Sequence, residues 1–237
     1  MITVGGVQVQ VIRKDIRNLH LGVYPPGGRV RVAAPLTVSD DAVRLAVIGK
    51  LGWIKRHRGQ FAAQPRQSAR EMVSGESHYY LGRRYRLRVT VDEAAVAKVV
   101  LRNRTTLELR ARPDLDAEGR ERLLQCWYRE RLRELAQPLV SRWEGILGVQ
   151  AAEWGIRRMK TRWGGCNPAA RRIWLNLDLA KKPPQCLEYL IAHELTHLIE
   201  PHHDSRFTAL MDRHLPNWRM HRQELNATPL GHAEWKY

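Results

Sequence analysis

Alternating apolar and polar residues predict a β-rich first third of the chain. Residues 8–12, 19–23 and 29–33 each alternate, which is the pattern of strands that bury one face. The segment 25–28 (Pro-Pro-Gly-Gly) predicts a turn between the last two strands. A helix capped by Ser39 is expected next, because apolar residues follow at helical spacing.

Two strand pairs and a long helix are predicted in the middle of the chain. Residues 79–81 with 85–89, and 99–101 with 107–109, have the composition of two hairpins. Residues 117–147 have helical spacing, and Pro138 is expected to kink or divide this helix. The apolar face predicted for it comprises Leu124, Tyr128, Leu132, Leu135, Leu139, Trp143 and Ile146. No internal repeat is evident in the sequence.

The last third predicts two short strands followed by helices. Residues 152–159 and 172–177 are strand-like. Pro183 and Pro184 open a helix with an apolar stripe, and Pro201 is expected to end it. Asp204 and Ser205 are the expected N-cap of a further helix. The pattern predicts an α+β fold, with a β-rich region over 1–112, a second region over 113–226 and a tail over 227–237; the two regions could also form one continuous domain.

The charge of the chain is strongly positive, with a formal net charge of +16. Residues 51–112 hold 14 Lys and Arg against 5 Asp and Glu, a net of +9. Such a basic stretch favours attraction to polyanions, including nucleic acid. No known nucleic-acid-binding motif accompanies it, so a basic solvated surface is favoured over specific nucleic-acid binding.

The number of cysteines and the lengths of the apolar runs indicate the cellular compartment. The three cysteines are odd in number and scattered, which argues against a disulfide framework and favours a reducing, cytoplasmic environment. No signal peptide and no apolar run long enough for a membrane span are apparent. The oligomeric state cannot be deduced from these features.

The sequence His193-Glu194-Leu195-Thr196-His197 carries the chemistry. Residues four apart lie on one face of a helix, so His193 and His197 can bind one metal ion together. His203 is the expected third ligand, with the adjacent His202 as the alternative. Three protein ligands leave one tetrahedral position for water, as in catalytic zinc sites, and Glu194 is then the expected general base.

These residues predict a hydrolase that uses one Zn²⁺ per chain. The leading hypothesis is attack of water on a peptide or related bond. The first alternative is a nucleotide phosphoanhydride hydrolase that uses the same site. The second is a non-catalytic, nucleic-acid-associated zinc protein, for which Glu194 would be unnecessary.

Two cations near the motif are candidates for substrate binding. Lys160 and Arg162 precede Gly164-Gly165, which is expected to form a tight turn. Arginine can bind a carboxylate or phosphate through two hydrogen bonds, so an anionic peptide or small molecule is the expected substrate. Alternatively, both cations are simply solvated. Cys166 is expected to be a buried apolar residue and not a nucleophile.

The chain resembles the YgjP-like metallopeptidase domain family. The resemblance rests on residues 159–166 (Met-Lys-Thr-Arg-Trp-Gly-Gly-Cys), 173–176 (Ile-Trp-Leu-Asn), 193–197, and His203 before Phe207. It implies a zincin-like catalytic region, zinc bound by His193, His197 and His203, and Glu194 as catalytic residue. The histidine spacing is also similar to the metzincin pattern, from which the chain departs at Glu200, where that pattern has glycine.

Overall fold

The computed structural model describes residues 1–24, 27–63, 71–94, 96–159 and 162–227. Contacts divide the chain into two compact units, Met1–Gln67 and Ser68–Tyr237. Pro25 and Pro26, Lys160 and the tail over 228–237 lie outside the described residues. No helix in the described segments is long and apolar enough to cross a membrane.

The first unit is a four-stranded sheet covered by two helices. Its elements are β1 (Ile2–Val4), β2 (Val7–Lys14), β3 (His20–Tyr24), β4 (Arg29–Pro35), α1 (Asp40–Ile48) and α2 (Leu51–Ala63). The strand order is β1-β2-β4-β3. The predicted strands and the Ser39 cap are confirmed, and the Ser39 hydroxyl accepts from the Ala42 N–H at 3.2 Å. The expected single helix is interrupted at Gly49 and Lys50.

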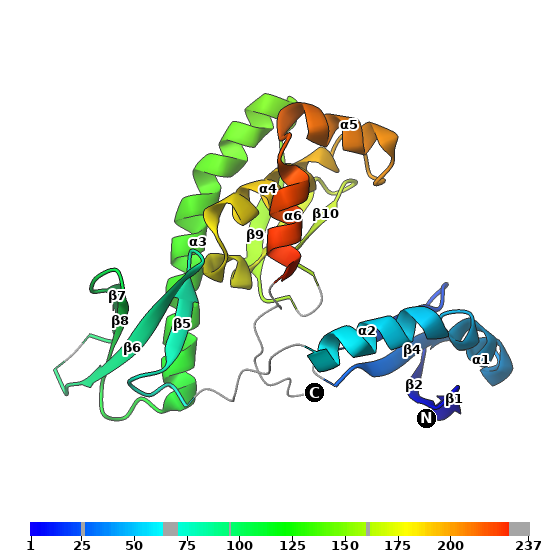
Figure 1. The fold of residues 1–237 in the computed structure, drawn as a ribbon, viewed down its shortest axis with the longest axis horizontal. Helices are drawn as coiled ribbons and strands as arrows, with labels where there is room; N and C mark the ends of the chain where they lie inside the picture. The colour runs from blue at the N-terminus through cyan, green and yellow to red at the C-terminus, as the bar shows by residue number, and fades with distance from the viewer. Residues whose placement is uncertain (25–26, 64–70, 95, 160–161, 228–237) are drawn as a thin grey trace. The chain divides into compact units, whose positions relative to one another are not determined.

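The second unit combines a four-stranded sheet, a three-stranded sheet and four α-helices (Figure 1). Its elements are β5 (Ser77–Tyr80), β6 (Arg83–Val91), β7 (Lys98–Leu101), β8 (Thr106–Ala111), α3 (Ala117–Leu147), β9 (Glu153–Arg157), β10 (Gly164–Asn167), β11 (Arg172–Asn176), the 3-10 helix η1 (Leu177–Lys181), α4 (Pro184–Thr196), α5 (Ser205–His214) and α6 (Trp218–Ala227). The strand orders are β5-β6-β8-β7 and β10-β11-β9. The α+β class is confirmed.

The two four-stranded sheets share one topology, although the sequence shows no repeat. In each sheet the outer strands pair antiparallel and the central strands pair parallel: β2 with β4, and β6 with β8. The first hairpin of each turns through two residues with positive φ, Gly5-Gly6 and Leu81-Gly82. Such turns suit the right-handed twist of paired strands. The strand topology therefore repeats although the side chains do not.

The predicted boundary at residue 112 falls inside the second unit. Buried residues of β6 and β8, such as Leu87 and Leu107, belong to the same core as Leu132 of α3. Apolar burial between this sheet and α3 therefore joins residues on both sides of position 112 into one body, while the division of the chain into compact units comes after residue 67.

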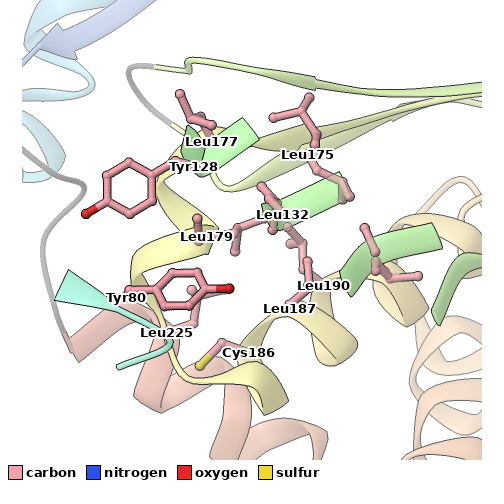
Figure 2. Close-up of a cluster of buried hydrophobic side chains, with 14 of the residues drawn as sticks. Tyr80, Tyr128, Leu132, Leu175, Leu177, Leu179, Cys186, Leu187, Leu190 and Leu225 are labelled. Atoms are coloured by element: carbon pink, nitrogen blue, oxygen red, sulfur yellow. The ribbon is translucent and has the colours of Figure 1, made fainter. Parts of the chain in front are cut away.

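The sequence predicts that Pro138 kinks or divides the long helix; the helix is not divided, because α3 runs unbroken for 31 residues. Proline has no N–H, so Pro138 leaves the carbonyl of Glu134, four residues earlier, without its helical hydrogen bond. Both residues are exposed, so water can reach that oxygen. The predicted apolar face is buried at Leu124, Tyr128, Leu132 and Trp143, but Ile146 is 44% exposed. Figure 2 shows Tyr128 and Leu132 in a cluster with Leu175, Leu190 and Leu225.

Candidate metal centre

The helix α4 begins where the sequence predicts and ends earlier. Pro183 is its N-cap and Pro184 its first residue, where the missing N–H needs no partner. Leu187, Leu190 and Leu195 are buried and anchor it in the core. The helix ends at Thr196, with His197 as C-cap in right-handed helical conformation, and not at Pro201. His197 therefore keeps the one-turn spacing from His193.

His197 is oriented by a backbone hydrogen bond. Its Nδ1 lies 3.0 Å from the carbonyl oxygen of Glu200. A donor Nδ1–H fixes the tautomer in which Nε2 is free to bind a metal ion. The turn after α4 thus contributes to the site through the Glu200 carbonyl, at the position where the metzincin pattern has glycine.

His203 returns to the first two histidines from the loop before α5. Its Nε2 lies 3.0 Å from Nε2 of His193, and one ligand atom from each histidine lies within 4.8 Å of the others. Asp204 caps α5 by accepting from the Phe207 N–H at 3.0 Å. The Phe207 ring then packs against all three imidazoles, with centroid distances of 4.8–5.0 Å. His202 is exposed and is not part of this group.

The histidines have the protonation state that a metal ligand needs. Burial, together with His197 and His203, lowers the pKa of His193 to about 3. Burial also lowers the pKa of His197. Neutral imidazole is the metal-binding form. Three nitrogen donors within reach of one point fit a zinc ion with one open position, and no other group of three potential ligands occurs in the described part of the chain.

Glu194 lies beside this group and is only 4% exposed. Burial raises its pKa to about 8, and the nearby charge of Arg162 opposes this rise. A carboxyl group with a pKa near neutrality is suited to take up and release protons.

The strand β10 lies directly against Glu194, and the sequence does not predict it. Gly164 and Gly165 belong to this strand and not to a tight turn, so that expectation is wrong. A Cβ on Gly164 would lie 2.6 Å from Oε1 of Glu194. Only glycine therefore allows this approach of strand to carboxylate. Gly164 is a site residue that the sequence alone does not identify, since paired glycines also suit a turn.

Cys166 stands on the same face of β10 as Gly164. Burial and the charge of Glu194 raise the pKa of its thiol to about 11, so the thiol stays protonated. A protonated thiol is a poor nucleophile, and the residue is half-buried. The three cysteines of the chain are free.

Arg162 lies close enough for its charge to act on Glu194, whereas Lys160 lies outside the described residues. The backbone carbonyl of Arg162 accepts from Asn176 Nδ2 at 2.8 Å, which ties Arg162 to the end of β11. The side chain is exposed, and its Nη1 lies 3.3 Å from the Cβ position of Gly165. Its charge acts on Glu194.

Tyr189 and Arg222 are further neighbours that sequence reasoning missed. Tyr189 lies one turn before His193 on α4, and its ring stacks on Trp218 at 6.3 Å and 10°. The charge of Arg222 on α6 acts on both Tyr189 and His193. Tyr189 could have been found from its spacing of four residues before His193, while Arg222 required the packing of α6 on α4.

Two comparisons with known proteins found a match. The sequence profile of a family described as "YgjP-like, metallopeptidase domain" matches residues 17–228. Among solved structures, a metallopeptidase zymogen, abylysin of Pyrococcus abyssi, is similar at 21% identity and a TM-score of 0.37. That match covers 39% of this chain and 92% of the other. No curated protein sequence matches.

Proposed function

Because the chain belongs to the YgjP-like metallopeptidase domain family, we propose that it is a zinc-dependent peptidase with Glu194 as general base. The observation that carries the proposal is the convergence of His193, His197 and His203 beside a buried carboxyl group. The family supports a metal-dependent hydrolase. Zinc, the site residues and a peptide substrate are our assignment.

The roles of the residues follow from their positions. His193, His197 and His203 would hold the ion, which when bound supplies Lewis-acid polarisation of the scissile carbonyl and a water of lowered pKa. Glu194 takes a proton from the attacking water and passes it to the leaving amine. The hydrogen bond from His197 to Glu200 and the packing of Phe207 hold the imidazoles in place.

The position of β10 favours an extended peptide substrate. This strand pairs with β11 on one side and is the edge of its sheet in the described residues. An extended peptide can pair with such an edge through main-chain hydrogen bonds. Because Gly164 of β10 lies against Glu194, a peptide on this edge would run past the general base.

The test is a hydrolysis screen of purified, zinc-loaded protein on peptides and nucleoside triphosphates, with Glu194→Gln as control. Peptide cleavage that the control lacks is expected. Cleavage of nucleoside triphosphates alone would replace the peptidase proposal with a phosphoanhydride hydrolase. Retained zinc without hydrolysis of either class would contradict both.

Gly164→Ala should reduce turnover while zinc content stays near normal. The added Cβ would push the Glu194 carboxylate or the strand aside, and displacement of a catalytic group by about 1 Å can cost ~10²-fold in rate. Gly165→Ala is the matched control, because its Cβ meets only the flexible end of Arg162 at 3.3 Å. Equal kcat for the two variants would argue against close packing of β10 on Glu194.

Arg162→Ala should raise KM for substrates that carry a negative charge near the scissile bond. Hydrogen bonds to charged groups contribute roughly 1.5–3 kcal/mol, so the rise is expected to be on the order of 10- to 100-fold. Arg162→Lys should restore only part of it, because lysine lacks the planar two-point contact. Matched acidic and neutral peptides at low and high salt provide the measurement. Arg157→Ala is the control, since Arg157 lies on β9, two strands from β10, where its guanidinium stacks on Trp174 of β11.

A further inference from the structure

In the second unit, α3 packs on one face of the sheet β5-β6-β8-β7, and no helix among the described residues of that unit packs on the other face, here called the arginine face. The register places Ser77 and Tyr79 of β5 beside Arg86 and Arg84 of β6. It also places Arg88 beside Glu108, and Thr90 beside Arg110, on the parallel strand β8. Paired residues project on the same side of a sheet, so these side chains share one face. Lys98 of β7, paired with Arg110, belongs to it as well.

The other face of the same sheet forms the core. Tyr85 and Leu87 alternate with the arginines along β6 and are buried, as are Leu107 and Leu109 of β8. They belong to the cluster that contains Leu132 of α3. Core packing therefore explains every second residue of β6 but not the arginines between them.

The described residues do not neutralise the positive charge of the arginine face. Glu108 is its one acidic residue in the described chain, and it is buried under ion pairs with Arg102 and Arg110. Burial alone would raise the pKa of Glu108. Hydrogen bonds from both arginines stabilise the carboxylate and outweigh burial, so the pKa is lowered. Arg84, Arg86 and Arg88 are exposed and form no ion pair with any described residue. They stand along one strand, with Cα atoms about 6.7 Å apart.

An aromatic ring stands at the end of this row. Tyr79 is 40% exposed and pairs with Arg84 across the hairpin. Its backbone carbonyl accepts from the Tyr128 hydroxyl at 2.7 Å, which ties its position to α3. A fixed, exposed ring beside unpaired guanidinium groups offers a surface for base stacking next to phosphate contacts.

We propose that the arginine face binds a single strand of nucleic acid, with Arg84, Arg86 and Arg88 on phosphates and Tyr79 stacked on a base. Charge complementarity selects a polyanion, and the exposed ring selects one with accessible base faces. This is a function separate from the metal centre. It gives a role to the basic stretch of the sequence, which the peptidase chemistry leaves unexplained.

The first unit repeats this arrangement. The helix-free face of its sheet carries Arg31 of β4 beside Gln10 of β2 and Gly22 of β3. Tyr24 and Arg29 are paired next to them. Val9, Val30 and Val32 fill the opposite, buried face. Two sheets of one topology thus both carry arginine and a tyrosine on the face that no described helix of the same unit covers.

The test is binding of fluorescent oligouridylate and oligodeoxythymidylate of about 15 nucleotides to the full chain over a range of salt. The variant Arg84→Ala/Arg86→Ala/Arg88→Ala should bind at least tenfold more weakly. Each phosphate contact contributes about 0.7 to the slope of log affinity against log salt for single strands, so the slope should fall by about 2. Tyr79→Ala should weaken strand binding about tenfold and leave heparin binding unchanged.

The matched control is Arg122→Ala/Arg133→Ala/Arg142→Ala, which removes the same charge from exposed positions on α3. If both triple variants lose affinity equally, the arginine face has no special part and the proposal is overturned. The proposal would also be overturned if Tyr79→Ala left the binding of the oligonucleotides as unchanged as the binding of heparin. Peptide hydrolysis by the Arg84, Arg86 and Arg88 variant should equal that of the wild type, which separates this result from the peptidase proposal.

Discussion

Glu194→Gln should retain zinc and lose about 10²–10⁴-fold in turnover, the usual cost of removing a general base. Glutamine keeps the shape and hydrogen-bonding capacity of the side chain, but it cannot take up the proton of the attacking water. None of the three nitrogen donors changes, so metal content should stay at one ion per chain. The measurements are metal analysis and kcat on the peptide found in the screen. A fully zinc-loaded variant with wild-type kcat would exclude Glu194 as the base.

The metal-free protein supplies a control that shows whether the variant is folded. Burial raises the pKa of Glu194 to about 8, above its usual value of 4.5, so the folded state binds more protons than the unfolded state between these values. Stability of the metal-free wild type should therefore fall as pH rises from about 4.5 to 8. Glu194→Gln removes this contribution. The metal-free variant should be more stable than the wild type above pH 8, measured by urea unfolding, because it buries no carboxylate.

The metal centre could be predicted largely from the sequence because its chemistry is local. A spacing of four residues on a helix fixes His193 against His197, and Asp204 caps the next helix immediately after His203. The three donors then converge through short connections. Short-range geometry is what periodicity and capping describe.

The surroundings of the centre could not be predicted because they depend on distant segments. Gly164 approaches Glu194 only after β10 pairs with β11, and a glycine pair gives the same sequence signal in a turn as in a close strand. Arg222 reaches the site through the packing of Trp218 on Tyr189, which joins α6 to α4. Neither contact leaves a periodic pattern in the sequence.

The repeated sheet was invisible in the sequence for a related reason. Topology is set by which strands pair, and many different side chains satisfy one pairing. The two sheets share their inward apolar alternation, as at Val9 and Leu87, while their outward residues differ. The predicted boundary at residue 112 falls inside the second compact unit because α3 covers the second sheet, which strand composition does not show.

His193→Ala, His197→Ala and His203→Ala should each weaken zinc binding by more than about 100-fold, since changes outside the ligand set already cost ~10–100-fold. His202→Ala is the matched control, because it is an adjacent, exposed imidazole outside the group. It should keep wild-type metal affinity. Competition with a chromogenic chelator gives the affinities without reference to activity. Zinc lost from His202→Ala but kept by His203→Ala would mean that the loop before α5 presents the other imidazole.

The same titrations should show an acid-resistant site. The lowered pKa of His193, to about 3, and the lowered pKa of His197 mean that these two imidazoles stay neutral at pH values where free histidine is protonated. Protons therefore compete weakly for them, and zinc affinity should fall less steeply below pH 6.5 than for three unperturbed histidines. The lowered pKa of His193 also affects folding, because the unfolded chain binds more protons at this residue between about pH 3 and 6.5. The stability of the metal-free protein should therefore decline as pH falls through this range. His193→Asn should remove that contribution, and an unchanged acid dependence of unfolding in this variant would show that His193 is not held neutral by burial.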